Sequence, residues 1–247
     1  VHDCAITENH LVVFDMSVTF NMDAAAAGAT FPYRWNNDHP SRVGLVPLGG
    51  DGSQVRWFDV DPGYVFHPIN AHEDGGRVVL DVVRYERIFD RFPLGPADST
   101  PAWWRWTLDH ATGAVMQRQI DDRGIEFPRV DERLVGRNAT VGYATGITVR
   151  DGSVSIGTHS VVLDLARERL HCFELGEDLV AGEWVMVPSA ASHDETDGYL
   201  MAFGFNRSSE RGELIILDAA APDAGFLARV LLPGRLPIGF HGNWFAR

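Results

Sequence analysis

Short runs of strand-forming residues, separated by turn signals, recur along the whole chain. In residues 54–86 the runs QVRWFDV, YVFHPINAHE and RVVLDVVRYE are separated by DPG and DGG. Val, Ile, Phe, Trp and Tyr favour strands, whereas Gly, Pro and Asp favour tight turns. The same alternation returns in 103–120, 146–165 and 199–233. Because helical periodicity of useful length is almost absent, we expect an all-β fold of antiparallel meanders.

Meanders without crossover helices are typical of sandwiches, barrels and propellers. The strand clusters recur at roughly 40 to 50 residues, which favours propeller blades. Segments 23–42 and 91–101 are richer in Ala, Gly, Pro, Asn and Asp, and we interpret them as long loops. The sequence therefore predicts one domain over residues 1–247.

Composition excludes several function classes. A hydrophobic content of 45% in 247 residues is enough to bury a core. The net charge of −13 would repel a phosphate backbone, so we expect no nucleic-acid partner. Cys4 and Cys172 form no CxxC motif or disulfide framework, and we find no signal peptide or long apolar span. These features indicate a cytoplasmic protein with free thiols, and the start at Val1 suggests a fragment.

Three of the ten histidines, His2, His67 and His241, lie among apolar and small residues, in VHDC, VFHPIN and GFHGNWF. Such settings would bury the imidazole, which then needs a partner. For a single position, a core histidine bonded to the backbone is the commoner case. Their sequence spacing cannot show convergence, but a closed propeller can bring inner strands to one axis. Imidazole ligands would suit Fe, Zn, Cu or Ni better than Mg or Ca.

Five ordered segments carry a family resemblance: HDCAITENHLVVFD, FHPINAHED, EFPRVDERLVGRNATVGYA, DETDGYLMAF and ELIILDAAAPDAGFLARVLLPGRLPIGFHGNWF. They resemble the signature blocks of the carotenoid cleavage oxygenase family and span nearly the whole chain. The resemblance implies a seven-bladed β-propeller in the full-length family. This chain would be its C-terminal portion, an incomplete propeller of about four blades.

The resemblance also implies a metal site. Family members hold Fe(II) with four histidines, and the matching positions here are His2, His67 and His241, with the fourth expected upstream. Glutamates accept hydrogen bonds from the outer imidazole nitrogens, which fixes ring orientation and tautomer. By resemblance Glu126 serves His67 and Glu195 serves His241, although an exposed loop charge is the ordinary alternative for a glutamate.

The implied function is a non-haem iron dioxygenase. It would use O2 to cleave a conjugated C=C bond of a carotenoid, apocarotenoid or stilbene-type substrate, giving two carbonyl products. No catalytic group beyond the metal ligands is expected, which agrees with the absence of a GxSxG motif. No partner protein is implied, and a peripheral membrane contact is compatible with polyenes that dissolve in bilayers. The fragment alone is expected to be inactive.

Alternative functions stay open at this point. A related branch of the family isomerises a retinoid ester instead of cleaving an alkene. A divalent-metal propeller hydrolase or lactonase would use carboxylate and Asn ligands at the axis, so metal identity distinguishes it. A non-catalytic or truncated propeller scaffold is the third alternative.

The other aromatic residues and histidines have simpler interpretations. An aromatic cluster can wall a tunnel for a polyene, but it is more often plain core. His72, five residues after His67, would point to the other face of a regular strand. We interpret the remaining histidines as surface groups. The aromatic positions are Trp103, Trp104, Trp106, Phe66 and Phe240, and the surface histidines are His10, His39, His110, His159, His171 and His193.

Overall fold

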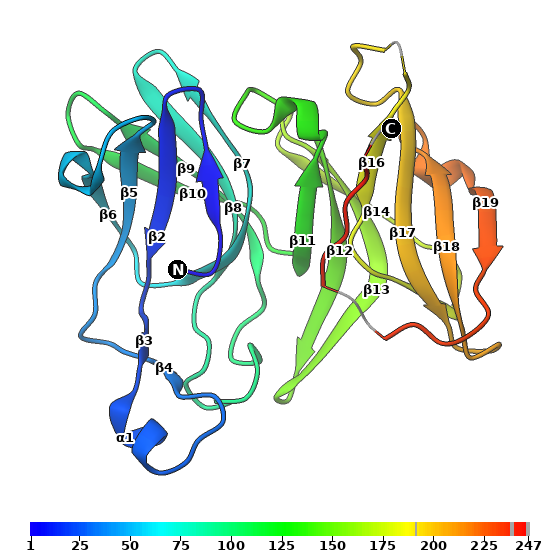
Figure 1. The fold of residues 1–247 in the computed structure, drawn as a ribbon, viewed down its shortest axis with the longest axis horizontal. Helices are drawn as coiled ribbons and strands as arrows, with labels where there is room; N and C mark the ends of the chain where they lie inside the picture. Colours follow the sequence, from blue (N-terminus) through cyan, green and yellow to red (C-terminus); the bar gives the residue numbers. More distant parts are fainter. Residues whose placement is uncertain (191, 238–239, 246–247) are drawn as a thin grey trace. The chain divides into compact units, whose positions relative to one another are not determined.

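The computed structural model describes residues 1–190, 192–237 and 240–245, and these consist mainly of β-strands (Figure 1). The strands are β1 (Cys4–Ile6), β2 (His10–Asp15), β3 (Val18–Phe20), β4 (Tyr33–Trp35), β5 (Ser41–Pro47), β6 (Arg56–Val60), β7 (Tyr64–Asp74), β8 (Arg77–Tyr85), β9 (Ala102–Asp109), β10 (Val115–Asp121), β11 (Ile125–Val130), β12 (Val141–Arg150), β13 (Ser153–Asp164), β14 (Arg169–Phe173), β15 (Leu179–Ala181), β16 (Val185–Pro188), β17 (Gly198–Asn206), β18 (Arg211–Asp218) and β19 (Phe226–Leu231). Helical segments are short: α1 (Met22–Ala26), η1 (Gly52–Gln54), η2 (Glu132–Leu134) and η3 (Pro222–Ala224).

The strands form successive sheets of neighbours in sequence. Their orders are β1-β2-β5-β6, β10-β9-β8-β7, β11-β12-β13-β14 and β15-β17-β18-β19, with β16 also paired to β17. Strands β3 and β4 form a separate two-stranded ribbon. Pairing between sequence neighbours such as β7, β8 and β9 is antiparallel. The all-β prediction and the meander pattern are therefore confirmed.

The chain folds into two compact units. The first contains residues 1–124 and 148–154, and the second contains residues 125–147 and 155–247. His2 and His67 belong to the first unit, whereas Glu126, Glu195 and His241 belong to the second. The single domain expected from the sequence remains a prediction.

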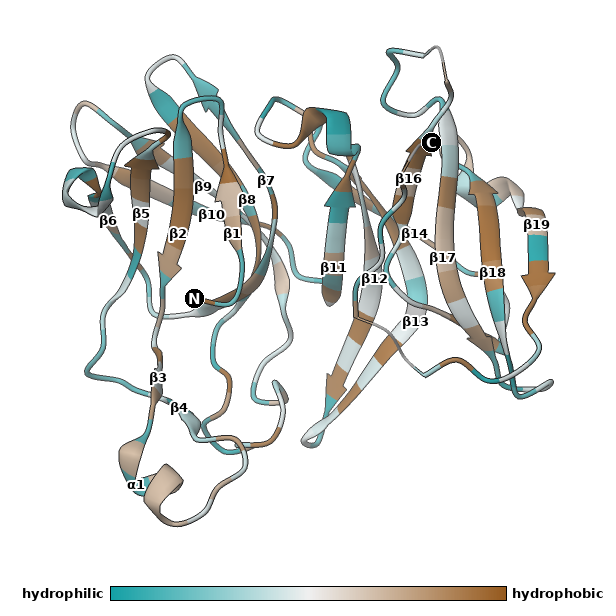
Figure 2. Ribbon diagram, viewed as in Figure 1, coloured by the Kyte–Doolittle hydropathy of each residue, from teal (hydrophilic) through white to brown (hydrophobic). Residues whose placement is uncertain are grey.

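The first two sheets share the core of the first unit. Val12 on β2, Val43 on β5, Leu80 on β8 and Trp106 on β9 are each 0% exposed and belong to one cluster. Figure 2 shows hydrophobic residues concentrated along strands such as β2 and β8, with hydrophilic residues in many of the connections. Burying one such apolar side chain stabilises the fold by about 1.5–3 kcal/mol. The alternation of apolar and polar residues along these strands therefore determines which face of the sheet is buried.

In the second unit, strand β17 is apolar on both faces. Leu200 and Ala202 are 0% and 3% exposed and lie in a core shared with strands β12, β14, β15, β16 and β18. Met201 and Phe203 point to the other face, where Phe203 is 58% exposed. Strands that are apolar on both faces are normally covered on both. This face is therefore built to pack against apolar material.

The prediction that residues 23–42 form one long loop is wrong in part. Helix α1 begins after Asn21, whose side chain accepts a hydrogen bond from the Ala24 N–H at 2.8 Å. An asparagine N-cap followed by an Asp and an alanine run is a helix-start signal. Segment 91–101 has no strand or helix, as expected.

Glu73, near the end of β7, anchors the β1–β2 turn. Its carboxylate accepts hydrogen bonds from Thr7 Oγ1 at 2.6 Å, Asn9 Nδ2 at 2.8 Å and Asn9 N at 3.1 Å. His10 Nδ1 lies 3.0 Å from the same carboxylate. Burial alone would raise the pKa of Glu73, but these hydrogen bonds outweigh it and lower the pKa to about 2.

The lowered pKa of Glu73 predicts an acid-dependent loss of stability. Its contribution is fully present above the unfolded-state pKa of 4.5 and is lost as the pH falls towards about 2. Since the side chain is 27% exposed, screening reduces the effect, and we expect about 1 kcal/mol. Urea unfolding of the full-length gene product, at about four pH values between about 6 and about 2.5, gives the free energy of unfolding. This free energy should fall less steeply towards low pH in Glu73→Gln than in the parent protein. An unchanged slope would contradict the assignment.

Candidate metal centre

His67 lies on an irregular strand at the edge of its sheet. Register shifts flank Pro68, between Val65 and Pro68 and again between Pro68 and Asn70. Proline cannot donate to the ladder, so it is found on edge strands and at bulges, and a bulge changes where neighbouring side chains point. His67 itself is 9% exposed, so its ring is buried in the first unit.

His2 brings a second imidazole to the same place. The ring centroids of His2 and His67 are 5.3 Å apart, with an interplanar angle of 80°. Two imidazoles bound to one ion through bonds of about 2.1 Å would have centroids roughly 4.5–5.5 Å apart when the ligands are adjacent. The observed pair therefore fits two adjacent ligands of one metal ion.

An aromatic cluster surrounds this pair on one side. The Phe66 ring packs edge-on against His2 at 4.9 Å and against Tyr64 at 4.8 Å. It also contacts Tyr85 and Phe89, which are 1% and 6% exposed. These rings give the histidine pair an apolar surrounding that excludes water on this side.

His241, in the second unit, is held by a buried carboxylate. Its Nδ1 lies 3.1 Å from Oε1 of Glu183, whose side chain is 5% exposed. The N–H of Gly242 donates to Oε2 of the same carboxylate at 2.9 Å. A carboxylate at Nδ1 favours the tautomer with its proton there and its lone pair on Nε2. This is the arrangement that a metal-binding imidazole needs.

The predicted pairing of Glu195 with His241 is wrong, because the carboxylate that Nδ1 contacts is that of Glu183. Glu195 instead accepts from the Thr140 N–H at 2.9 Å and the Val141 N–H at 3.1 Å, and from the Thr140 hydroxyl. It thereby holds the start of β12. A charged residue in the otherwise apolar run LVAGEWVMV was the sequence signal for Glu183.

Glu126 is 3% exposed and lies on β11, where the register shifts between Glu126 and Arg129. Its Oε2 accepts from the Phe127 N–H at 2.8 Å, and Phe127 has a φ of 52°. A left-handed aromatic residue is strained, and such strain is often found at functional sites. Because Glu126 and His67 belong to different units, their pairing stays a prediction.

Within the described ranges 1–190, 192–237 and 240–245, no group of three or more His, Cys, Asp or Glu side chains is arranged to hold a metal ion. The structure brings His2 and His67 together, and the role of His241 as the third ligand is part of the proposal below.

The three tryptophans of β9 pack mainly in the core of the first unit. Trp103 and Trp106 are 0% exposed, and the Trp103 Nε1 atom donates to Asp81 at 2.8 Å. Trp104 packs against the same core and carries the Arg84 guanidinium 4.6 Å from its ring. The core interpretation is therefore confirmed for Trp103 and Trp106, whereas Trp104 is half-buried and lines a pocket with Arg84.

Two of the histidines interpreted as surface groups have specific partners. His10 contacts Glu73, and His39 Nε2 lies 2.7 Å from Asp15 Oδ1. Their side chains are 16% and 31% exposed. The surface prediction is wrong for these two, because their carboxylates come from distant positions in the chain.

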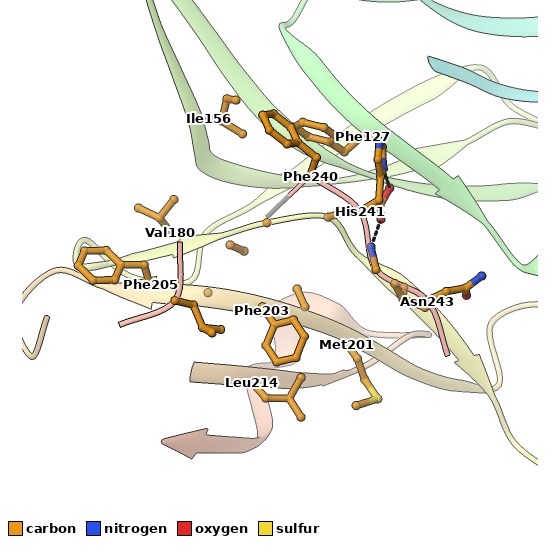
Figure 3. A pocket seen from close by; sticks show the side chains of 18 of the residues that line it. Phe127, Ile156, Val180, Met201, Phe203, Phe205, Leu214, Phe240, His241 and Asn243 are labelled. Carbon is orange, nitrogen blue, oxygen red and sulfur yellow. Dashed lines mark hydrogen bonds and ion pairs between the residues drawn. The ribbon is translucent and has the colours of Figure 1, made fainter. Parts of the chain in front are cut away.

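An apolar cavity of about 310 Å³ lies beside His241 in the second unit. Figure 3 shows Phe127, Phe240 and His241 together at one side, and Met201, Phe203 and Leu214 on another. Cavities of about 300–1,000 Å³ with mainly apolar walls are typical of small-molecule sites. The Phe127 ring is 5.8 Å from the His241 ring, so the cavity and the histidine share a wall.

The sequence of the chain matches a known family. The family model described as "Retinal pigment epithelial membrane protein" (RPE65) matches residues 1–246. The chain belongs to the RPE65/carotenoid cleavage oxygenase family.

Several relatives in this family are oxygenases by name. A carotenoid cleavage oxygenase of Mycobacterium tuberculosis is 37% identical over 99% of this chain and 58% of its own length. An apocarotenoid-15,15'-oxygenase of Synechocystis is 30% identical over 99% of this chain and 51% of its own length. An isoeugenol monooxygenase of Pseudomonas putida is 27% identical over 99% of this chain and 54% of its own length. The chain thus spans about half the length of the curated relatives it matches.

Solved structures of the family share the fold of this chain. A cobalt-substituted Synechocystis ACO is 28% identical, with a TM-score of 0.86, over 100% of this chain and 53% of that one. An ACO/RPE65 chimera is 26% identical, also with a TM-score of 0.86 and the same coverage. The all-β assignment of this chain is consistent with both.

Proposed function

We propose that this chain is part of an Fe(II)-dependent oxygenase that cleaves a conjugated C=C bond. The observation that carries the proposal is the His2–His67 pair, with rings 5.3 Å apart beside an aromatic cluster. His2, His67 and His241 would be metal ligands, and Glu126 would support His67. Imidazole ligands suit iron, whereas a calcium-type hydrolase would need oxygen ligands.

We propose a task for each of these residues. His67 and His2 would hold the ion from a strand and the segment before β1. Glu183 keeps the proton of His241 on Nδ1, so that Nε2 is available. When bound, iron(II) would supply the redox chemistry with O2. The two oxygen atoms of O2 would end in two carbonyl products, one from each alkene carbon, so no proton donor or nucleophile from the protein is needed.

The substrate class follows from the apolar surfaces. The cavity beside His241 is lined mainly by apolar side chains, which favours a conjugated hydrocarbon over a polar ligand. The named relatives act on carotenoids, apocarotenoids and isoeugenol, which are conjugated compounds of different length. We therefore propose a carotenoid, apocarotenoid or stilbene-type substrate together with O2.

A β-propeller is the finer fold that we propose. The sheets of four and five strands follow one another along the chain, as blades do. We expect the chain expressed alone to aggregate and to lack activity.

The test is metal content and O2-dependent turnover of the full-length gene product. After anaerobic reconstitution with Fe(II), we expect about one iron per chain and loss of polyene or stilbene absorbance only when O2 is added. Absence of iron, or hydrolysis supported by Ca²⁺ instead, would reject the oxygenase proposal.

We also propose a peripheral membrane contact through the segment that contains β3, α1 and β4, residues 18–35. The cytoplasmic location stays a prediction. Phe20 and Met22 are 50% and 72% exposed in this segment, and Phe20 packs 5.6 Å from Tyr33. No helix within the described part of the chain is long and apolar enough to cross a membrane. Insertion of these side chains into the lipid interface would be favourable, as for other exposed apolar groups.

Phe20→Ser combined with Met22→Ser should weaken vesicle binding of the full-length gene product at least about thirtyfold, since the two side chains together bury apolar area worth more than about 2 kcal/mol. Co-sedimentation with phosphatidylcholine vesicles measures the bound fraction. Met116→Ser is the matched control, because Met116 is 60% exposed on β10 in the first unit. Equal binding of all three proteins would contradict the contact.

A further inference from the structure

We infer that Arg129 is a positioning residue for the proposed metal ligand His241. The guanidinium of Arg129 holds the Glu183 carboxylate and also binds the backbone next to His241. The inference rests on the proposed function, because it assigns Arg129 a role at that metal site. It concerns a residue that touches neither the ion nor the His241 ring in the contacts described above.

The buried carboxylate of Glu183 is shared by three donors. Its Oε1 contacts His241 Nδ1 at 3.1 Å, and its Oε2 accepts from the Gly242 N–H at 2.9 Å and from Arg129 Nη1 at 3.0 Å. A carboxylate that is only 5% exposed has lost most of its hydration, which a cation or several hydrogen-bond donors must replace. Arg129 is the cation that contacts the Glu183 carboxylate.

Arg129 also ties down the segment that carries the histidine. The same Nη1 atom donates to the Gly242 carbonyl at 3.0 Å. Both backbone polar groups of Gly242 are therefore hydrogen-bonded: its N–H donates to Glu183 and its C=O accepts from Arg129. Arg129 extends from strand β11, where it is paired with Tyr143, and its side chain is only 19% exposed. A rigid strand thus fixes both the carboxylate and the backbone beside His241.

Loss of the guanidinium would free Glu183 to turn towards other donors. The imidazole of His241 would then lose the acceptor that orients it, and the Gly242 carbonyl would lose its hydrogen bond from Arg129. Partners of this kind typically affect metal affinity about 10- to 100-fold. Lysine keeps the charge but not the planar fork, so it should restore the function only in part.

The experiment compares two Arg–Glu pairs of the second unit, in each of which the glutamate side chain is buried. Arg229 binds Glu213 through Nε at 2.6 Å and Nη2 at 2.8 Å, and the Glu213 side chain is 1% exposed. Arg129→Met and Arg229→Met therefore remove the same chemical group from similar pairs. Metal affinity of the full-length gene product is measured with Fe(II), and with Co(II) as a spectroscopic probe, by competition with a chromophoric chelator. Thermal unfolding is measured alongside.

We expect Arg129→Met to weaken metal binding at least about tenfold and to change the Co(II) absorption, and Arg129→Lys to lie between it and the parent. Arg229→Met should lower thermal stability to a similar extent but leave metal affinity within about twofold. If Arg129→Met does not fold, Arg129→Lys decides the matter.

Parent-like affinity in Arg129→Met, or in Arg129→Lys where only that variant folds, would overturn the inference while the proposed function stands. Equal weakening by Arg229→Met would also overturn it, because the effect would then be general destabilisation. A parent protein that binds no metal would overturn both.

Discussion

Replacing His67 by alanine is expected to abolish metal binding and O2-dependent cleavage in the full-length gene product. His67 is 9% exposed on a bulged strand, with the His2 ring 5.3 Å away. Residues that only support a ligand already cost about 10- to 100-fold in affinity, so loss of a ligand should lower activity by more than about 100-fold. Metal analysis measures the loss of metal binding, and the initial rate of absorbance loss measures the loss of cleavage. We expect the same two losses in His241→Ala.

The control for these variants is His171→Ala, because the His171 side chain is 66% exposed and its nearest charged partner, Asp223, is 3.7 Å away. It should keep parent metal content and rate. Thermal unfolding shows whether His67→Ala retains its fold, since removing a buried ring leaves a cavity. A folded His67→Ala protein with normal iron content would remove His67 from the metal site.

The strand pattern was readable because it depends on local chemistry. The runs around DPG and DGG became β6, β7 and β8 almost to the residue. The helix α1 was missed, although Asn21, Asp23 and the alanines after it form an ordinary helix start. The Ala, Gly and Asn content of segment 23–42 as a whole predicts a loop and conceals this local helix start.

The partners of polar side chains were harder to predict, because they come from distant segments. His10 finds Glu73 at a sequence separation of 63, and His241 finds Glu183 at a separation of 58. The apolar run LVAGEWVMV around Glu183 is the local signal that favours it over Glu195. What separates them is burial: Glu183 has a 5% exposed side chain beside the fully buried Trp184, whereas Glu195 is in a turn and half-buried.

Replacing the two glutamates by glutamine tests which carboxylate serves His241. Glu183→Gln keeps the shape of the side chain but removes the charge that binds Arg129 and the Nδ1 proton of His241. We expect metal affinity of the full-length gene product to fall up to about 100-fold, with a parallel loss of cleavage rate. Chelator competition under anaerobic conditions measures the affinity.

Glu195→Gln is the matched control, since it makes the same chemical change in the same unit. Its carboxylate binds the backbone of Thr140 and Val141, so its loss should cost about 1 kcal/mol of stability by weakening charge-assisted hydrogen bonds. Metal affinity should stay within about twofold of the parent, because these contacts hold the start of β12 and not the imidazole. The reverse order, with Glu195→Gln losing metal and Glu183→Gln keeping it, would restore the pairing expected from the sequence. It would also remove the reason for Arg129 to act on His241, since Arg129 reaches that ring through Glu183.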